Sequence, residues 1–342
     1  MKKLFLGFAA LGLILASCQK DEFANEQEQI DYNGEISGKS RICKSHEILE
    51  KQIAKNPKRL ELLEQIENQT KSLILAKKPG GGNGNGNGPG GGGGNDNEPP
   101  TDFPVVTIPV YVHVIYNTSQ ENISEAQIDS QIQVLNDDFR MTNSDSNQIP
   151  TEFADRAADT QIQFTLAGVT RTFSERTSWG TRDDMKRSSQ GGVDPIDPAN
   201  YLNIWVCNIG GGILGYAQFP GGSLDTDGVV VGPQFFGTQG YLAAPFNEGR
   251  TTTHEVGHYL NLRHIWGDGR CRQDDFVADT PDSDRANYGC PSYPTNHCKS
   301  NDMTMNYMDY VDDACMYMFS NGQKLRMRAV LEPGSIRSDL VN

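Results

Sequence analysis

Residues 251–264 read Thr-Thr-Thr-His-Glu-Val-Gly-His-Tyr-Leu-Asn-Leu-Arg-His. On a helix, His254 and His258 are separated by just over one turn, so both imidazoles project from nearly the same face and can bind one metal ion. Glu255 directly follows the first histidine, where its carboxylate can reach a water on that metal without being a ligand itself. This spacing is the one that a zinc hydrolase requires.

The third metal ligand separates two classes of zinc protease. One class takes a glutamate from a following helix, but no glutamate occurs between Glu255 and Glu332. The other takes a third histidine after a sharp turn, and His264, six residues after His258, fits that arrangement. We expect the turn at Asn261, because asparagine is second only to glycine in tolerating a left-handed backbone.

A second motif, Met305-Asn306-Tyr307-Met308-Asp309-Tyr310, lies downstream and would supply an apolar floor beneath the zinc histidines. With the extended zinc motif and four clustered cysteines, it makes the chain from about residue 102 onward resemble the metzincin zinc proteases, specifically the pappalysin or cytophagalysin-like family. The resemblance implies Met308 as the methionine of the turn below the metal, with Met305 as the competing choice. An ordinary core role for both methionines is the alternative.

The resemblance implies a zinc endopeptidase acting on protein or peptide substrates. Zinc would polarise the scissile carbonyl and lower the pKa of a water, and Glu255 would take the proton and pass it to the leaving amine. Tyr310 is implied to lie close to the metal, where its hydroxyl could stabilise the oxyanion. Relatives of this kind often favour a basic residue just after the scissile bond, but the sequence does not single out an acidic partner for it.

The catalytic unit is expected over residues 102–342 and has an α/β (α+β) pattern. Alternating or continuous apolar runs predict strands over 105–116, 162–172, 201–209 and 228–231, and a helix capped by Ser124 over 124–140. We expect a twisted mixed sheet with backing and active-site helices, followed by a loop-rich, disulfide-stapled C-terminal subdomain. The strand over 201–209 is predicted to form the upper rim of the cleft, although its apolar pattern equally fits a core strand.

Four of the seven cysteines fall near the C-terminus and should be oxidised in an extracellular compartment. Residue types alone permit three connectivities. The resemblance favours Cys271 with Cys298, and Cys290 with Cys315. A second zinc site is the rival interpretation, but none of the four lies in a C-x-x-C pair.

The loop after the zinc motif is rich in oxygen ligands, and relatives of this kind bind calcium nearby. Calcium takes six to eight oxygens, more than the sequence of this loop alone can show. Within the loop we expect Asp275, Asp279 and Thr280 to contribute.

The N-terminus has the layout of a secretory signal peptide over residues 1–17. Lys2 and Lys3 precede an apolar run that is too short to span a membrane, and small residues lead into Cys18. The last residues resemble a bacterial lipobox, which implies lipidation of Cys18 and anchoring as an outer-membrane lipoprotein, at the cell surface or released after processing. The alternative is an ordinary secretory signal with a chance cysteine.

Three further segments precede the catalytic unit. Residues 18–40 are polar and acidic and predict a disordered tether. Residues 41–78 place apolar side chains at helical spacing with one break at Pro57, which predicts two short helices that need another surface to cover. Residues 79–101 form a Gly/Asn/Pro linker. This is the layout of a removable pro-segment; a spacer between membrane and domain is the alternative.

Cys43 stands at the head of that pro-segment. Its thiolate could occupy the open position of the zinc and exclude water, as implied by latent members of the family. Cleavage near Lys77-Lys78 or in the linker would then release it. The alternatives are a free surface thiol or a disulfide with Cys207. Without that disulfide, Cys207 is predicted to be a buried core residue.

The net charge of −14 argues against nucleic acid as a partner, because phosphate binding needs clustered cations and no basic stripe is present. We expect a monomer. The main competing function is a catalytically inactive, peptide- or protein-binding surface lipoprotein on the same fold, yet none of the catalytic residues is lost. A zinc-stabilised adhesion module would instead need a closed four-ligand site.

Overall fold

The structure is a computed structural model that describes residues 40–76 and 103–341. The predictions for the signal peptide, Cys18, the tether up to residue 39, the linker and the cleavage region at Lys77-Lys78 lie outside the described residues. Among the helices that are described, none combines the length and the apolar character needed to cross a bilayer.

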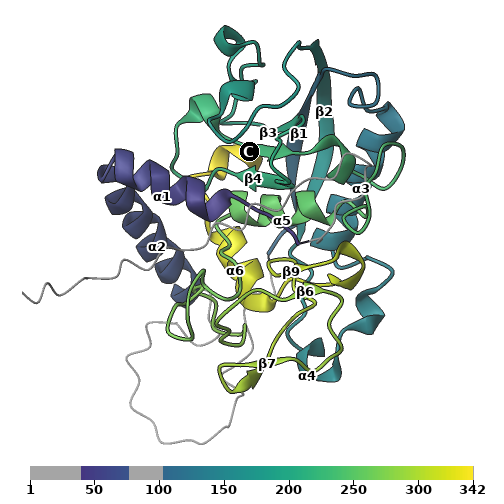
Figure 1. Cartoon of the computed structure of the whole chain (residues 1–342). Coiled ribbons are helices and arrows are strands. Elements are labelled where there is room, and N and C mark those ends of the chain that lie inside the picture. Colours follow the sequence, from purple (N-terminus) through teal and green to yellow (C-terminus); the bar gives the residue numbers. More distant parts are fainter. Residues whose placement is uncertain (1–39, 77–102, 342) are drawn as a thin grey trace, which may run out of the picture. The chain divides into compact units, whose positions relative to one another are not determined.

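A five-stranded mixed sheet forms the centre of the catalytic unit, with strand order β2-β1-β3-β5-β4 (Figure 1). The parallel strands are β1 (Val106–Tyr116), β2 (Ile162–Phe173), β3 (Leu202–Val206) and β5 (Val229–Val231). The short strand β4 (Gly215–Ala217) pairs antiparallel with β5 at one edge. The predicted mixed sheet and its four predicted strands are therefore confirmed.

The expectation that the strand over 201–209 forms the rim of the cleft is wrong. β3 lies in the middle of the sheet, and all five of its residues are buried. A short run that is apolar on both faces is typical of such a central parallel strand. The edge beside the active-site helix belongs to β4 instead, whose three residues are too few to produce a periodic signal.

Helices α3 (Glu125–Phe139) and α5 (Arg250–Tyr259) contact each other as well as the sheet. Ser124 caps α3 as predicted, because its side chain accepts a hydrogen bond from the Gln127 N–H at 3.2 Å. On the face that meets the sheet, Ile128, Leu135 and Phe139 are fully buried. The remaining helices of the catalytic unit are α4 (Thr151–Ala154) and α6 (Asn321–Ala329).

The segment before the linker forms the two predicted helices, α1 (Ser45–Lys55) and α2 (Lys58–Ala76), with the break at Pro57. Both pack on the catalytic unit: α2 lies against α6, and α1 approaches β4 (Figure 1). Ile66 joins the main hydrophobic core, and Ile48 joins a second apolar cluster beneath β4. These helices therefore bury their apolar faces on the following domain, as such a short segment must.

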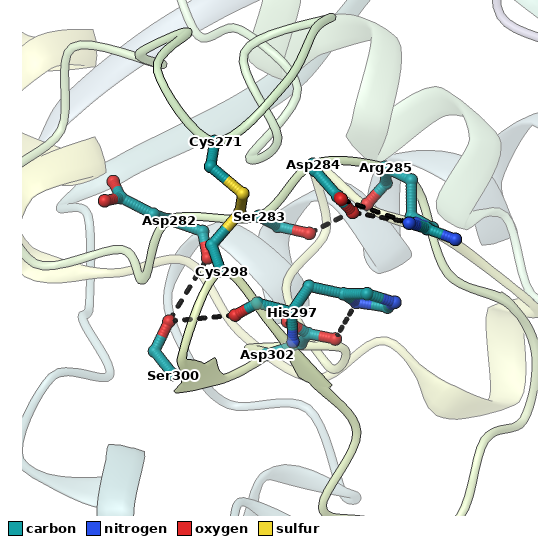
Figure 2. Close-up of a disulfide and its surroundings, with 9 residues drawn as sticks. All are labelled: Cys271, Asp282, Ser283, Asp284, Arg285, His297, Cys298, Ser300 and Asp302. Carbon is teal, nitrogen blue, oxygen red and sulfur yellow. Dashed lines mark hydrogen bonds and ion pairs between the residues drawn. A yellow bond between two sulfur atoms is a disulfide. The ribbon is translucent and has the colours of Figure 1, made fainter.

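The C-terminal half is loop-rich and contains the short strands β6 (Tyr288–Gly289), β7 (Asn296–His297), β8 (Ser300–Asn301) and β9 (Tyr310–Val311). Disulfides join Cys271 to Cys298 and Cys290 to Cys315, which is the pairing that the family resemblance implies. Figure 2 shows the first disulfide beside the His297–Asp302 ion pair, whose Nδ1 and Oδ2 atoms lie 2.6 Å apart. With so little regular structure, covalent links hold these loops in place.

Replacing the first disulfide, as Cys271→Ser with Cys298→Ser, should lower the free energy of unfolding by about 3 kcal/mol, because its 27-residue separation restricts the unfolded chain. Urea unfolding of the full chain under non-reducing conditions measures this. The matched pair Cys290→Ser with Cys315→Ser, with a separation of 25 residues, should lose a similar amount. An unchanged unfolding midpoint in both would contradict the stapling role.

Candidate active site

Three histidine side chains converge at the C-terminal end of α5. Nε2 of His258 lies 3.1 Å from Nε2 of His254 and 3.1 Å from Nε2 of His264. All three imidazoles are buried. The Cys43 sulfur joins them, so that the four ligand atoms lie within 4.8 Å of one another.

This arrangement fits a zinc ion. Tetrahedral Zn–N bonds of about 2.0–2.1 Å would place two ligand nitrogens roughly 3.4 Å apart, close to the distances found here. Burial, together with the neighbouring imidazoles, lowers the pKa of His254 and of His258 well below the usual range. Both rings are thus held in the neutral form that binds metal.

The second ring nitrogen of each histidine has a protein partner. The Nδ1–H of His254 donates to the Tyr307 carbonyl at 2.7 Å, and that of His258 donates to the Leu262 carbonyl at 2.8 Å. Nδ1 of His264 bonds to the Asp268 carboxylate. These contacts orient the rings and leave each Nε2 free to face the common centre.

The turn after α5 brings the third histidine back to the first two. Asn261 has a φ of 76°, which confirms the left-handed conformation predicted from its sequence position. The Leu262 N–H donates to the Gly257 carbonyl at 2.9 Å. Nε of Arg326, on α6, donates to the Asn261 carbonyl at 2.7 Å and so secures the turn from outside.

Met308 lies directly beneath α5. A Cβ atom added to Gly257 would be only 2.4 Å from the Met308 sulfur, so this approach requires glycine in the helix. Met305, the competing choice, is buried, and its backbone carbonyl accepts a hydrogen bond from the Tyr317 N–H at 2.7 Å. The geometry therefore favours Met308 as the floor of the site.

Glu255 is buried beside the histidines and beneath β4. Its Oε2 accepts a hydrogen bond from the Ser45 hydroxyl at 2.8 Å and lies 3.4 Å from the Cys43 sulfur. Burial raises the pKa of Glu255 to about 7, against the opposing effect of those two hydrogen bonds. A Cβ on Gly215 would lie 2.9 Å from Glu255 Cγ, so only glycine lets the strand approach this closely.

Tyr310 lies at the same centre, as the resemblance implies. Its ring centroid is 4.9 Å from that of His264 and 5.8 Å from that of His254. The Tyr310 hydroxyl donates to the backbone carbonyl of Cys43 at 3.2 Å. The Tyr310 hydroxyl therefore already binds a peptide carbonyl of this chain.

The chain before α1 lies along the free edge of β4. The Leu214 N–H donates to the Ile42 carbonyl at 3.0 Å, and the Lys44 N–H donates to the Gly215 carbonyl at 3.3 Å. The Ser45 hydroxyl also accepts a hydrogen bond from the Ala217 N–H, at 2.8 Å. These contacts hold Cys43 over the histidines. Cys207 is a free, buried thiol elsewhere in the core, so the alternative disulfide is not formed in this structure.

Arg41 is buried near this centre, where burial and, to a smaller extent, the Arg41 charge lower the pKa of His254. One of its guanidinium nitrogens lies 2.5 Å from Oδ1 of Asp313, and both side chains are almost fully buried. The guanidinium also donates to the Val311 carbonyl and to the Thr251 hydroxyl, and it lies 5.0 Å from the centre of the Phe246 ring.

The three predicted calcium residues all hydrogen-bond to groups of the protein. The Thr280 hydroxyl donates to Asp275 at 2.8 Å, and burial raises the pKa of Asp275 to about 7. Asp279 points to the start of α6, where it accepts hydrogen bonds from the Ser320 hydroxyl at 2.6 Å and from the Gly322 N–H at 2.8 Å. This geometry gives no support for calcium at these three residues, and Asp279 serves as a helix cap.

Sequence reasoning missed several residues of the site. Asp268, four residues after His264, has the spacing of a partner for that histidine and could have been found. Ser45 follows Cys43 by two residues, but nothing in the sequence pairs it with Glu255. Asp313 is one of many aspartates, and only the folded chain distinguishes it.

Comparisons with known proteins agree with this geometry. The family model for peptidase M43, described as pregnancy-associated plasma protein-A, matches residues 187–332. An extracellular metalloprotease of Arthroderma benhamiae is 35% identical over 236 residues, covering 65% of this chain and 71% of the relative. One from Pyricularia oryzae is 33% identical over 236 residues, covering 66% and 75%.

Two solved structures are similar over most of the described chain. Mature mirolysin of Tannerella forsythia, in complex with a cleaved peptide, has a TM-score of 0.69 and 46% identity, covering 70% of this chain and 97% of that one. A mutant of promirolysin from the same organism has a TM-score of 0.76 and 40% identity, covering 88% and 97%. The promirolysin match extends over more of this chain than the mature one.

Proposed function

Because the chain belongs to the peptidase M43 family of metalloendopeptidases, we propose that it is a secreted, lipid-anchored zinc endopeptidase made as a latent precursor. The observation that carries the proposal is the convergence of His254, His258 and His264 beside a buried Glu255. A zinc ion held by these imidazoles would polarise a peptide carbonyl and lower the pKa of a water toward 7.

In this proposal Glu255 moves the proton. Its carboxylate accepts the proton of the attacking water and returns it to the leaving amine. Tyr310 donates its hydroxyl hydrogen bond to the carbonyl oxygen as negative charge develops there. Its present hydrogen bond to the Cys43 carbonyl supports this assignment. Met308 supports the histidines from below.

Glu255→Gln should lower kcat about 10²- to 10⁴-fold in the proteolytically activated enzyme, because the amide cannot accept the proton. Zinc should remain bound at one equivalent, since the three imidazoles are intact. A denatured protein substrate and metal analysis measure the two effects. Glu125→Gln, an exposed change on α3, is the control. Full activity of Glu255→Gln would contradict the assignment.

Latency is proposed to come from the segment around Cys43. The thiol lies where it can take the open position of the metal, and the Ser45 hydroxyl hydrogen-bonds to the proposed general base. The two residues therefore engage both reacting groups of the site. The wider match to promirolysin, a precursor by its name, supports treating residues 41–78 as a pro-segment.

Cys43→Ala should raise the activity of the uncleaved full chain about tenfold or more, since each ~1.4 kcal/mol of lost binding opens the site tenfold more often. Cys207→Ala removes the other buried free thiol and should leave latency unchanged. A quenched peptide assay on intact precursor compares them. If Cys43→Ala showed the same lag as the wild type, the thiol would have no blocking role.

The buried Arg41–Asp313 ion pair suggests a substrate preference. Asp313 there holds a guanidinium within reach of the centre, and the family resemblance implies a basic residue just after the scissile bond. We propose that the same carboxylate binds the basic side chain of the substrate once the pro-segment has left.

Asp313→Asn should reduce the ratio of kcat/KM for an arginine peptide to that for its citrulline analogue about 10- to 100-fold, because a charged hydrogen bond is worth about 1.5–3 kcal/mol. Taking the ratio cancels any general loss of activity that follows from a less stable fold. An unchanged ratio would mean that Asp313 does not determine the preference for a basic residue.

The cellular setting follows from the N-terminus and the relatives. Similar proteins are named extracellular metalloproteases, which supports secretion. The lipobox at Cys18 supports anchoring as an outer-membrane lipoprotein, and we propose a monomer. The inactive binding lipoprotein is the weaker candidate, because the residues of the metal site and Glu255 are all present.

A further inference from the structure

A buried carboxylate links α5 to the segment that precedes Met308. Asp138, in the last turn of α3, is 2% exposed. Its Oδ2 accepts a hydrogen bond from the Thr253 hydroxyl at 2.7 Å, and its Oδ1 accepts one from the Tyr307 hydroxyl at 2.8 Å. Each oxygen of this carboxylate therefore accepts a hydrogen bond from a hydroxyl in a different part of the chain.

Both hydroxyls belong to residues that are directly coupled to His254. Thr253 precedes this histidine on α5. Tyr307 offers it the carbonyl that accepts the Nδ1–H bond at 2.7 Å. Through Thr253, Asp138 fixes the backbone next to His254. Through Tyr307, it fixes the carbonyl that orients the His254 ring.

Arg250 supplies the compensating charge. Its guanidinium lies 3.5 Å from Oδ1 of Asp138 and 5.8 Å from the centre of the Tyr307 ring. It also bonds twice to Asp145, at 2.5 and 3.0 Å. A buried carboxylate is costly even when it is paired, and apolar side chains of similar volume would often stabilise the core as well. The polar group is therefore better explained by the geometry that it imposes.

We propose that Asp138 is a positioning residue of the metal centre, which aligns Nε2 of His254 by holding Thr253 and the Tyr307 hydroxyl at the same time. This inference rests on the metal site of the proposed function. It concerns a residue that touches neither the metal nor the substrate and that lies more than a hundred residues before α5 in the sequence.

The test is the zinc dissociation constant of the full chain, measured by chelator competition. Tyr307→Phe removes only the hydroxyl and leaves the carbonyl that binds His254. It should raise the dissociation constant about tenfold, because partners of metal ligands typically contribute 10- to 100-fold to affinity. Tyr259→Phe is the matched control, because Tyr259 is a buried tyrosine of α5 whose ring packs against the Arg337 guanidinium.

Two substitutions at Asp138 provide an independent test, because they predict an order of zinc affinities. Asp138→Asn keeps one acceptor oxygen and should fall between the wild type and Asp138→Ala in zinc affinity. Thermal unfolding of the metal-free proteins separates loss of fold from loss of metal. If Asp138→Ala does not fold, Tyr307→Phe and Asp138→Asn still decide the question.

The inference is overturned if Tyr307→Phe and Asp138→Asn bind zinc as the wild type does while losing no more thermal stability than Tyr259→Phe. Asp138 would then be an ordinary buried polar residue, and the zinc site itself would stand. A wild-type chain that binds no zinc would instead overturn the proposed function and this inference together.

Discussion

Three buried histidine Nε2 atoms must lie close enough together to bind one metal ion, and the packing of much of the structure brings them there. Two of them come from one turn of α5, which needs only a helix. The third requires the chain to reverse at once, which it does through the left-handed Asn261. Packing around the helix then has to be unusually close: Met308 approaches Gly257 from below, and β4 reaches Glu255 only because Gly215 has no side chain.

The parts of the site that could be predicted are those whose geometry is local. The spacing of His254, His258 and His264 is defined along one helix and one turn, so residue types and intervals were enough. The cap at Ser124 and the break at Pro57 are local in the same sense. The resemblance added Tyr310 and the disulfide pairs, which spacing alone left open.

What could not be predicted depends on tertiary packing. The rim strand β4 has three residues, and its role comes from lying at the sheet edge beside α5. The longer apolar run at β3 gave the stronger signal but belongs to the centre of the sheet. Asp279 is a residue type that binds calcium, yet both of its carboxylate oxygens accept hydrogen bonds from the start of α6. Asp138 and Asp313 acquire their contacts only when distant segments meet.

The contacts of the N-terminal segment also limit the order in which parts of the protein can assemble. Arg41 pairs with Asp313, 272 residues later, and Glu67 pairs with Arg326, which in turn holds the Asn261 carbonyl. The N-terminal segment leaves the ribosome long before the residues that it contacts. Asp313 and Arg326 both lie within the last 30 residues of the chain, so the contacts that hold the N-terminal segment cannot form until synthesis is almost complete. Docking of α1 and α2 is therefore a late event, although these helices are made first.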